Sequence, residues 1–176
     1  MKIRKSIARD EYEIENVRKI VWMNTYPNEK AGITVADIEN KFKADTNTNV
    51  KLKQKIGKNE NGHGKKTKQT WVAEDNGKII GFCVVEKNGK NRISAIYILP
   101  QYQNKGIGGK LMARGLKWLG NNKKIYVNVV EYNLPAINFY GKNGFAKTGK
   151  KGVFDSGAKF TNGKSMTEIE LLKLNL

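Results

Sequence analysis

The chain has 176 residues, which is long enough for one domain with a hydrophobic core, and 39% of its residues are hydrophobic. It lacks an apolar run of the roughly 18 residues that a membrane-spanning helix needs, an apolar stretch typical of a signal peptide near its start, and a second cysteine for an internal disulfide. The 33 Lys and Arg against 16 Asp and Glu give a formal net charge of +17, which favours anionic partners such as nucleic acid, a membrane surface or a phosphorylated cofactor.

The amino-terminal residues predict a strand and then an amphipathic helix. The strand is predicted over residues 2–8. Asp10 and Glu13 have the spacing of a capping box, so the helix is predicted to begin there. Pro27 and Gly32 are predicted to end it. Its apolar residues recur at helical spacing, at Ile14, Val17, Ile20 and Val21.

A second short helix and a lysine-rich loop are predicted next. Thr34 and Asp37 repeat the capping signal, and Ile38 and Phe42 would face the core. Residues 50–69 are rich in Lys, Gly and Asn and poor in large apolar side chains, so they predict a mobile surface loop. The lysines either serve an anionic partner or reflect a source proteome in which lysine and asparagine are abundant.

The middle of the chain changes to a β pattern. Three β-rich runs, at residues 69–75, 78–86 and 92–100, predict an antiparallel meander. The dipeptide Asn76-Gly77 separates the first two runs and is the strongest short-range signal for a two-residue hairpin turn.

The second half alternates helices and strands. A glycine-containing helix is predicted at residues 104–120, with Ile107, Leu111 and Leu119 near one face. A strand at residues 124–130 follows. Pro135 and Gly144 suit the first turn and the carboxyl-terminal cap of a short helix. Two closing strands are predicted at residues 144–150 and 166–174.

This order predicts the fold class. It reads β α α β β β α β α β β, and the strand–helix–strand passage from Arg92 to Val130 predicts a right-handed parallel crossover. The remaining strands should pair antiparallel. We therefore predict a single mixed α+β domain over residues 1–176, with a mostly antiparallel mixed sheet, one parallel β-α-β crossover and about four flanking helices.

The stretch ILPQYQNKGIGGKLM, from Ile98 to Met112, predicts an anion site between a strand and a helix. A P-loop would need glycine at position 104, and a dinucleotide fingerprint that begins at Gly106 would need glycine at position 111; the chain has Asn104 and Leu111. Free backbone N–H groups at a helix start can still bind an anion, and glycine lets that anion approach closely. The alternative is a helix start without a ligand, where the glycines serve tight packing.

The surrounding residues resemble two motifs of the GNAT superfamily of N-acetyltransferases. Gln103, Gly106 and Gly108 form a Gln-x-x-Gly-x-Gly pattern that follows a β run, and this resembles motif A. The downstream segment NLPAINFYGKNGF resembles motif B, with the characteristic residues Asn133, Ala136, Tyr140 and Gly144-Phe145. The resemblance implies a GNAT-like fold over nearly the whole chain and acetyl-coenzyme A as co-substrate.

The resemblance also implies which residues would bind the coenzyme. The loop would cradle the pyrophosphate, the strand before it would pair with the pantetheine arm, and the motif B segment would face the coenzyme from the other side. The loop residues are Gln103, Asn104, Lys105, Gly106, Ile107, Gly108, Gly109 and Lys110. The remaining residues are Ile96, Ile98, Asn133, Ala136 and Tyr140.

The implied chemistry is acetyl transfer from the thioester to an amine, which makes the chain an acyltransferase. Tyr140 would protonate the departing thiolate, and backbone N–H groups of a bulged strand around Ile98 would stabilise the oxyanion. In many relatives a glutamate on the fourth strand acts as the base, but the corresponding strand here, residues 92–98, has no carboxylate. Glu131 is the nearest candidate for the base, and the alternative is that Glu131 is a solvated residue at a strand end. A base is unnecessary if the amine arrives partly neutral.

The acceptor is expected to be a primary amine on a small molecule such as a polyamine. Glu13, Glu29 and Glu131 are the carboxylates that could attract such a cation. The alternatives are a protein amino terminus or lysine side chain, and a non-catalytic domain that binds coenzyme A or nucleic acid. We expect a cytoplasmic protein with no metal, no membrane partner, only weak and nonspecific nucleic-acid binding, and a possible homodimer.

Overall fold

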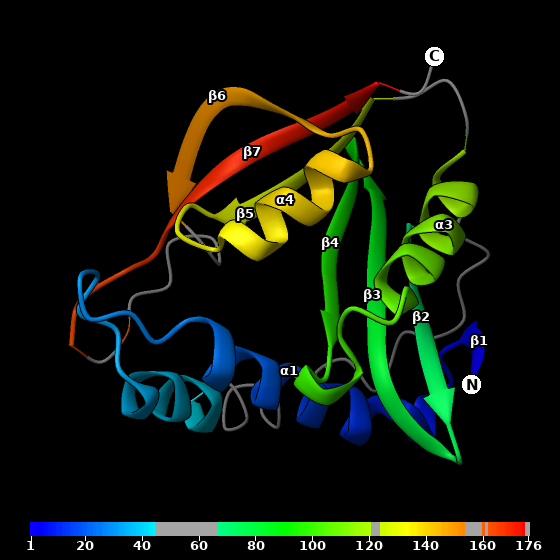
Figure 1. Ribbon diagram of the computed structural model, residues 1–176, viewed down its shortest axis with the longest axis horizontal. Helices are drawn as coiled ribbons and strands as arrows, with labels where there is room; N and C mark the ends of the chain where they lie inside the picture. Colours follow the sequence, from blue (N-terminus) through cyan, green and yellow to red (C-terminus); the bar gives the residue numbers. More distant parts are fainter. Residues whose placement is uncertain (45–66, 121–123, 154–159, 161, 175–176) are drawn as a thin grey trace, which may run out of the picture.

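The computed structural model describes residues 1–44, 67–120, 124–153, 160 and 162–174. These residues form a seven-stranded sheet in the order β1-β2-β3-β4-β5-β7-β6, flanked by helices (Figure 1). The strands are β1 (Lys2–Lys5), β2 (Lys68–Asp75), β3 (Lys78–Asn88), β4 (Lys90–Ile98), β5 (Lys124–Val130), β6 (Ala146–Val153) and β7 (Thr167–Leu174). The helices are α1 (Glu11–Thr25), a helix at residues 35–44, α3 (Ile107–Leu119) and α4 (Leu134–Lys142), with 3-10 turns η1 (Ala8–Asp10) and η2 (Pro100–Tyr102).

The predicted fold class and element order are confirmed. Every neighbouring pair of strands in this sheet is antiparallel except β4 and β5, which are parallel across the α3 crossover. Helix α1 packs on one face of the sheet, where Val17 and Val21 meet Val72 and Phe82. Helix α3 packs on the other face, where its apolar residues meet Ala73 of β2 and Cys83 of β3. In the described residues, no helix is long and apolar enough to cross a membrane.

Helix α1 begins where the sequence predicts, with Asp10 as its amino-terminal cap residue, but Asp10 and Glu13 do not form a capping box. The turn η1 precedes α1, and the Asp10 carboxylate accepts a hydrogen bond from the Ile7 N–H at 2.8 Å and from Arg4. Glu13 instead accepts from the Ile79 N–H of β3 at 2.7 Å, which ties the helix to the sheet. The sequence spacing alone could not distinguish a local cap from these tertiary hydrogen bonds.

The second capping signal and the hairpin are confirmed. Thr34 and Asp37 exchange hydrogen bonds, with Thr34 N donating to Asp37 Oδ2 at 2.9 Å and Asp37 N donating to Thr34 Oγ1 at 3.2 Å. Asn76 and Gly77 have φ angles of 47° and 77°, the left-handed pair that a type I′ turn requires. These local signals succeed because backbone conformation and side-chain reach within four residues decide them.

The lysine-rich loop falls largely outside the described residues. Its predicted end at Gln69 is wrong, because β2 begins at Lys68. Lys68 pairs with Glu86 and Gln69 with Val85, so the long partner strand β3 extends the ladder by these residues.

The parallel pair β4 and β5 separates soon after it begins. Its register contains only Asn91 opposite Ile125 and Arg92 opposite Tyr126. On its other edge β5 pairs with β7 along its whole length, from Lys124 to Val130, so no described strand pairs with the rest of β4 on the side of β5. The sheet is therefore open along the rest of β4, and this opening positions the candidate site.

Candidate active site

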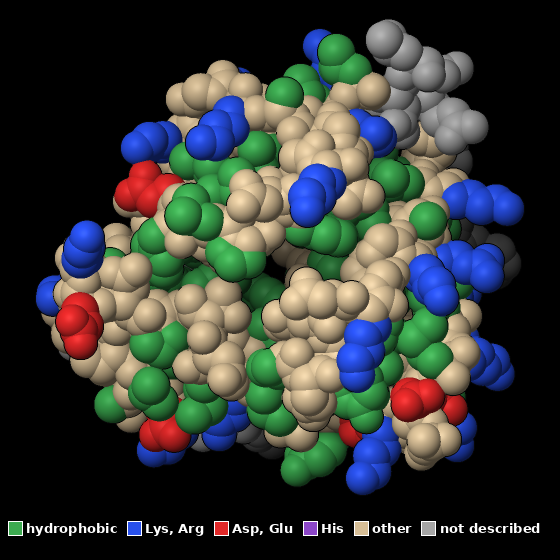
Figure 2. Space-filling view, in the orientation of Figure 1, with side chains coloured by type: hydrophobic (Ala, Val, Ile, Leu, Met, Phe, Trp, Pro, Cys, Tyr) green, Lys and Arg blue, Asp and Glu red, His purple; other side chains and the backbone are tan. Residues whose placement is uncertain are grey.

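A cleft of about 580 Å³ lies where β4 and β5 diverge. Residues of α1, β4, α3, β5 and α4 line it, so it extends from the α3 face of the sheet to the α1 face. Figure 2 shows a deep hollow near the middle of the molecule, surrounded by hydrophobic and other uncharged side chains. Among the described residues that line the cleft, none is Asp, Glu, Lys or Arg.

The loop before α3 presents backbone N–H groups to one end of this cleft. Gly106 caps the helix in the left-handed region, at φ 73°, and the first N–H with an acceptor inside the helix is that of Lys110, which donates to Gly106 O at 3.2 Å. No described residue accepts from the N–H groups of Ile107, Gly108 or Gly109. The first turn of α3 carries no acidic residue, so the positive end of the helix dipole is available to an anion.

The two helical glycines of this loop differ in their surroundings. A Cβ at Gly108 would lie 3.2 Å and 3.3 Å from two atoms of the Phe139 ring, so this glycine serves the packing of α3 on α4. A Cβ at Gly109 would meet nothing within 4 Å. Both residues line the cleft, but only at Gly109 does the protein leave the space beside the backbone open.

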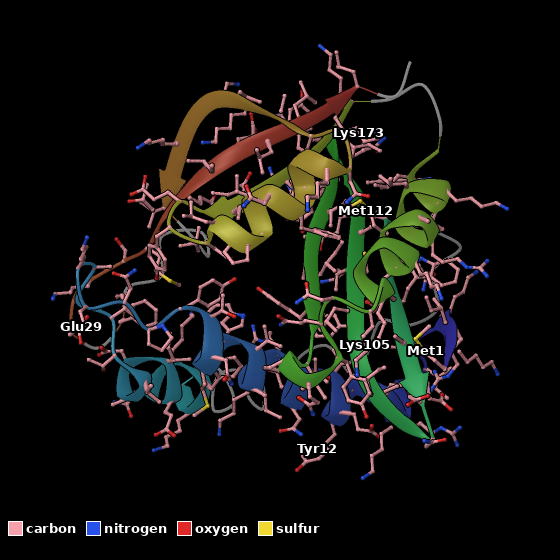
Figure 3. All side chains as sticks on the ribbon, viewed as in Figure 1. Met1, Tyr12, Glu29, Lys105, Met112 and Lys173 are labelled. Carbon is pink, nitrogen blue, oxygen red and sulfur yellow. The ribbon has the colours of Figure 1, made fainter. Side chains whose placement is uncertain are left out.

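The polar and basic side chains of the loop do not all face the cleft. Gln103 and Asn104 line it, and Gln103 Nε2 donates to Ile98 O at 3.0 Å, which holds the loop against β4. Lys105 lies on the loop before α3, with its Nζ 5.3 Å from the centre of the Tyr102 ring (Figure 3). Lys105 and Lys110 are exposed and do not line the cleft, so they contribute charge near its mouth rather than contacts inside it.

The edge of β4 that faces β5 carries backbone N–H groups to which no described residue offers an acceptor. Leu99 N donates to Ile80 O of β3 at 3.0 Å, whereas Ile98 O faces the other way and accepts from Gln103. Consecutive residues of an extended strand direct their backbone groups to opposite edges, so Ile96 and Ile98 present their N–H groups toward β5. The register against β3 skips Ser94, so β4 is a bulged strand and its bulge lies at Ser94.

Tyr140 lines the cleft and is 6% exposed. Its ring packs edge-on against Phe139 and Phe145, with centroid distances of 5.3 Å and 5.5 Å. No described residue forms a hydrogen bond with its hydroxyl group. Burial, with smaller contributions from Cys83 and Tyr97, raises the pKa of Tyr140 well above its ordinary value. The phenol therefore remains protonated at neutral pH and can donate a proton.

The motif B residues Asn133 and Ala136 also line the cleft. Asn133 Oδ1 accepts from Ala136 N at 3.2 Å, which makes Asn133 the amino-terminal cap of α4. The two residues therefore position the helix that carries Tyr140, in addition to any contact with a ligand.

Glu131 does not lie with these residues. Its carboxylate pairs with Lys151 at 2.9 Å, and Glu131 is not among the residues that line the cleft. The two other carboxylates considered for attracting a cation are also elsewhere: Glu13 is bonded to β3, and Glu29 lies at the outer edge of the molecule (Figure 3). The structure thus brings together the loop, β4 and Tyr140, but not a carboxylate base from this set.

Four residues that line the α1 side of the cleft were missed from the sequence. Tyr26 and Tyr97 have hydroxyl oxygens 3.4 Å apart, and Tyr132 Oη donates to Tyr26 O at 2.8 Å. Burial raises the pKa of Tyr26 well above its ordinary value and that of Tyr132 to about 12. Asn128, on β5, is the fourth. Its only sequence signal is a polar side chain within an otherwise apolar run.

Comparison with known proteins yields a family match. Residues 33–145 match the family described as "Acetyltransferase (GNAT) family". Peptidyl-lysine N-acetyltransferase YiaC of Escherichia coli (strain K12) is 32% identical over 77 residues, which are 44% of this chain and 49% of that protein. Spermine/spermidine N(1)-acetyltransferase of Bacillus subtilis (strain 168) is 29% identical over 86 residues, which are 42% of this chain and 57% of that protein. The chain thus matches about half the length of these curated relatives.

A solved structure agrees with the fold. PaiA N-acetyltransferase from Thermoplasma acidophilum, in complex with coenzyme A, superposes with a TM-score of 0.62 at 21% identity and covers 98% of each chain. At this identity the similarity shows the fold and does not extend to the ligand.

Proposed function

Because the chain belongs to the GNAT family of acetyltransferases, we propose that it transfers an acetyl group from acetyl-coenzyme A to a primary amine of a small molecule such as a polyamine. The observation that carries this proposal is the cleft through the sheet, whose lining joins the α3 loop to Tyr140 and to residues of α1. Such a passage lets two substrates meet from opposite faces.

The loop before α3 fits the anionic part of the coenzyme. Three backbone N–H groups without acceptors point from the positive end of a helix, and the open space at Gly109 allows a phosphate to approach them. Lys110 in the first turn is unfavourable beside the helix dipole of the free protein, and a bound phosphate would offset that repulsion. The net charge of +17 also favours association with such an anion.

The residues along the cleft are suited to three steps of acetyl transfer. Bound acetyl-coenzyme A would supply an activated acetyl group as a thioester. The lone pair of a neutral amine forms the new C–N bond as the C–S bond breaks, and the amine loses its proton to solvent. The N–H groups of Ile96 and Ile98 would stabilise negative charge on the carbonyl oxygen, and Tyr140 Oη would give its proton to the leaving thiolate and regain one from water.

The acceptor is inferred from the lining and from the relatives. The described lining is uncharged, so the cleft would bind the reacting end of a polyamine while its other ammonium groups remain outside. A peptide lysine is the second candidate acceptor, because the Escherichia coli relative is named for that activity.

A thermal-shift comparison tests the cofactor. Acetyl-coenzyme A should raise the melting temperature by mass action, whereas NAD and ATP at equal concentration should raise it much less. Equal shifts from all three would indicate nonspecific anion binding and refute the cofactor proposal. A panel of monoamines, polyamines and lysine peptides, assayed with acetyl-coenzyme A, then identifies the acceptor class.

A further inference from the structure

Asn128 has a buried hydrogen-bond acceptor that the folded chain leaves unused. It lines the cleft from β5, and its Oδ1 is buried without a hydrogen-bond partner among the described residues. The other end of the same amide is engaged, because Nδ2 donates a short hydrogen bond to Glu168 Oε1 on β7. Buried polar atoms without partners are uncommon in folded proteins, so this oxygen suggests a missing donor.

Glu168 fixes the orientation of the Asn128 amide. A carboxylate only accepts hydrogen bonds, so it must face the NH₂ end of the amide and not its oxygen. The contact results from the sheet topology, since β7 lies directly beside β5 and places Glu168 opposite Val130, two residues along from Asn128. Rotation of the amide would break this bond, and Oδ1 is therefore held as the free end.

Asn128 lies on the α1 face of the sheet, opposite the proposed coenzyme loop. Side chains alternate along a strand, so Asn128 shares a face with Val130, which packs with Trp22 and Tyr26 of the α1 region. Ile125, Val127 and Val129 point to the other face and pack in the core with α3. A coenzyme on the α3 loop would therefore leave Oδ1 free for the second substrate.

We propose that Asn128 Oδ1 binds the reacting amine of the acceptor, and that Glu168 positions Asn128 for this contact. This inference rests on the proposed function. An N–H of a primary amine would supply the donor that Oδ1 lacks, while the lone pair of the amine stays directed toward the β4 edge. Asn128 is thus a substrate-binding residue, and it does not act as a base because a neutral amide does not take up the proton.

Steady-state kinetics of Asn128→Leu tests the proposal. This substitution keeps the branched shape of the side chain and removes both polar ends of the amide. The KM for the amine should rise by about 5- to 160-fold, which corresponds to about 1–3 kcal/mol, and the thermal shift with acetyl-coenzyme A should stay that of the wild type. Glu168→Gln is a milder variant, because its amide can also donate to Oδ1 and compete with the substrate; here the amine KM should rise by about 2- to 12-fold.

Thr148→Val is the matched control. Thr148 Oγ1 donates to Glu170 Oε1 at 3.1 Å, so it forms a similar hydrogen bond to β7 outside the cleft. Loss of this bond should change neither the KM for the amine nor the KM for acetyl-coenzyme A. An unchanged amine KM in Asn128→Leu, or an equal weakening of amine and acetyl-coenzyme A, would overturn the proposal. A wild-type protein that fails to bind acetyl-coenzyme A would instead refute the proposed function, so the two failures are distinguishable.

Discussion

Replacing Gly109 by alanine should stabilise the free protein and weaken coenzyme binding at the same time. Gly109 is the third residue of α3, it has no positive φ, and an added Cβ would meet nothing within 4 Å. Alanine is favoured over glycine in a helix by about 0.5–1 kcal/mol, because glycine loses more conformational freedom on folding. The same methyl group would occupy the space through which a phosphate must approach the free N–H groups.

The two effects have magnitudes that can be compared. A gain of about 0.5–1 kcal/mol should raise the melting temperature of the free protein by about 1–4 °C. Acetyl-coenzyme A at about 100 times its Kd should stabilise the wild type by about 2.7 kcal/mol. If the methyl group weakens binding about tenfold, the variant should gain only about 1.4 kcal/mol at the same concentration. The loss of about 1.3 kcal/mol exceeds the helix gain, so the order of stability should reverse.

Thermal unfolding with and without acetyl-coenzyme A measures this reversal. The matched control is Gly141→Ala in α4, where an added Cβ also meets nothing within 4 Å but the residue does not line the cleft. That variant should differ from the wild type by the same amount in both conditions. If Gly109→Ala kept the full coenzyme shift, close approach of a phosphate at Gly109 would be refuted.

The other predictions concern Tyr140, Glu131 and the lysines. Tyr140→Phe should lower kcat by about 10²–10⁴-fold while the thermal shift with acetyl-coenzyme A persists, because general acid catalysis acts mainly in the transition state; an unchanged kcat would make Tyr140 a packing residue only. Burial raises the pKa of Tyr140, so the folded state holds its proton more tightly than the unfolded state, whose tyrosines have a pKa of about 10. Stability should therefore fall as pH rises above about 10, and melting temperatures from pH 9 to 12 should show a smaller fall in Tyr140→Phe. Glu131→Gln should leave the acidic limb of the pH–rate profile unchanged, since Glu131 pairs with Lys151 outside the cleft; a lost limb would restore Glu131 as the base. Nucleic-acid binding, measured across a salt series, should be weak at low salt and absent near physiological salt, and tight selective binding would contradict this expectation.

The sequence by itself determined the features that depend on neighbours along the chain. The Asn76-Gly77 turn, the Thr34–Asp37 cap and the glycine loop at the start of α3 follow from backbone conformation and side-chain reach over a few residues. The element order also followed, because helices and strands have different hydrophobic periods. The family motifs are local for the same reason.

Only the tertiary structure decided which of these residues form a site. Glu131 and Asn128 lie three residues apart on one segment, yet one pairs with Lys151 outside the cleft and the other lines it. Glu168 reaches Asn128 because β7 lies between β5 and β6, and the cleft exists because β4 and β5 separate after two paired residues. Strand neighbours and register depend on the packing of both sheet faces, so spacing within a single segment does not determine them.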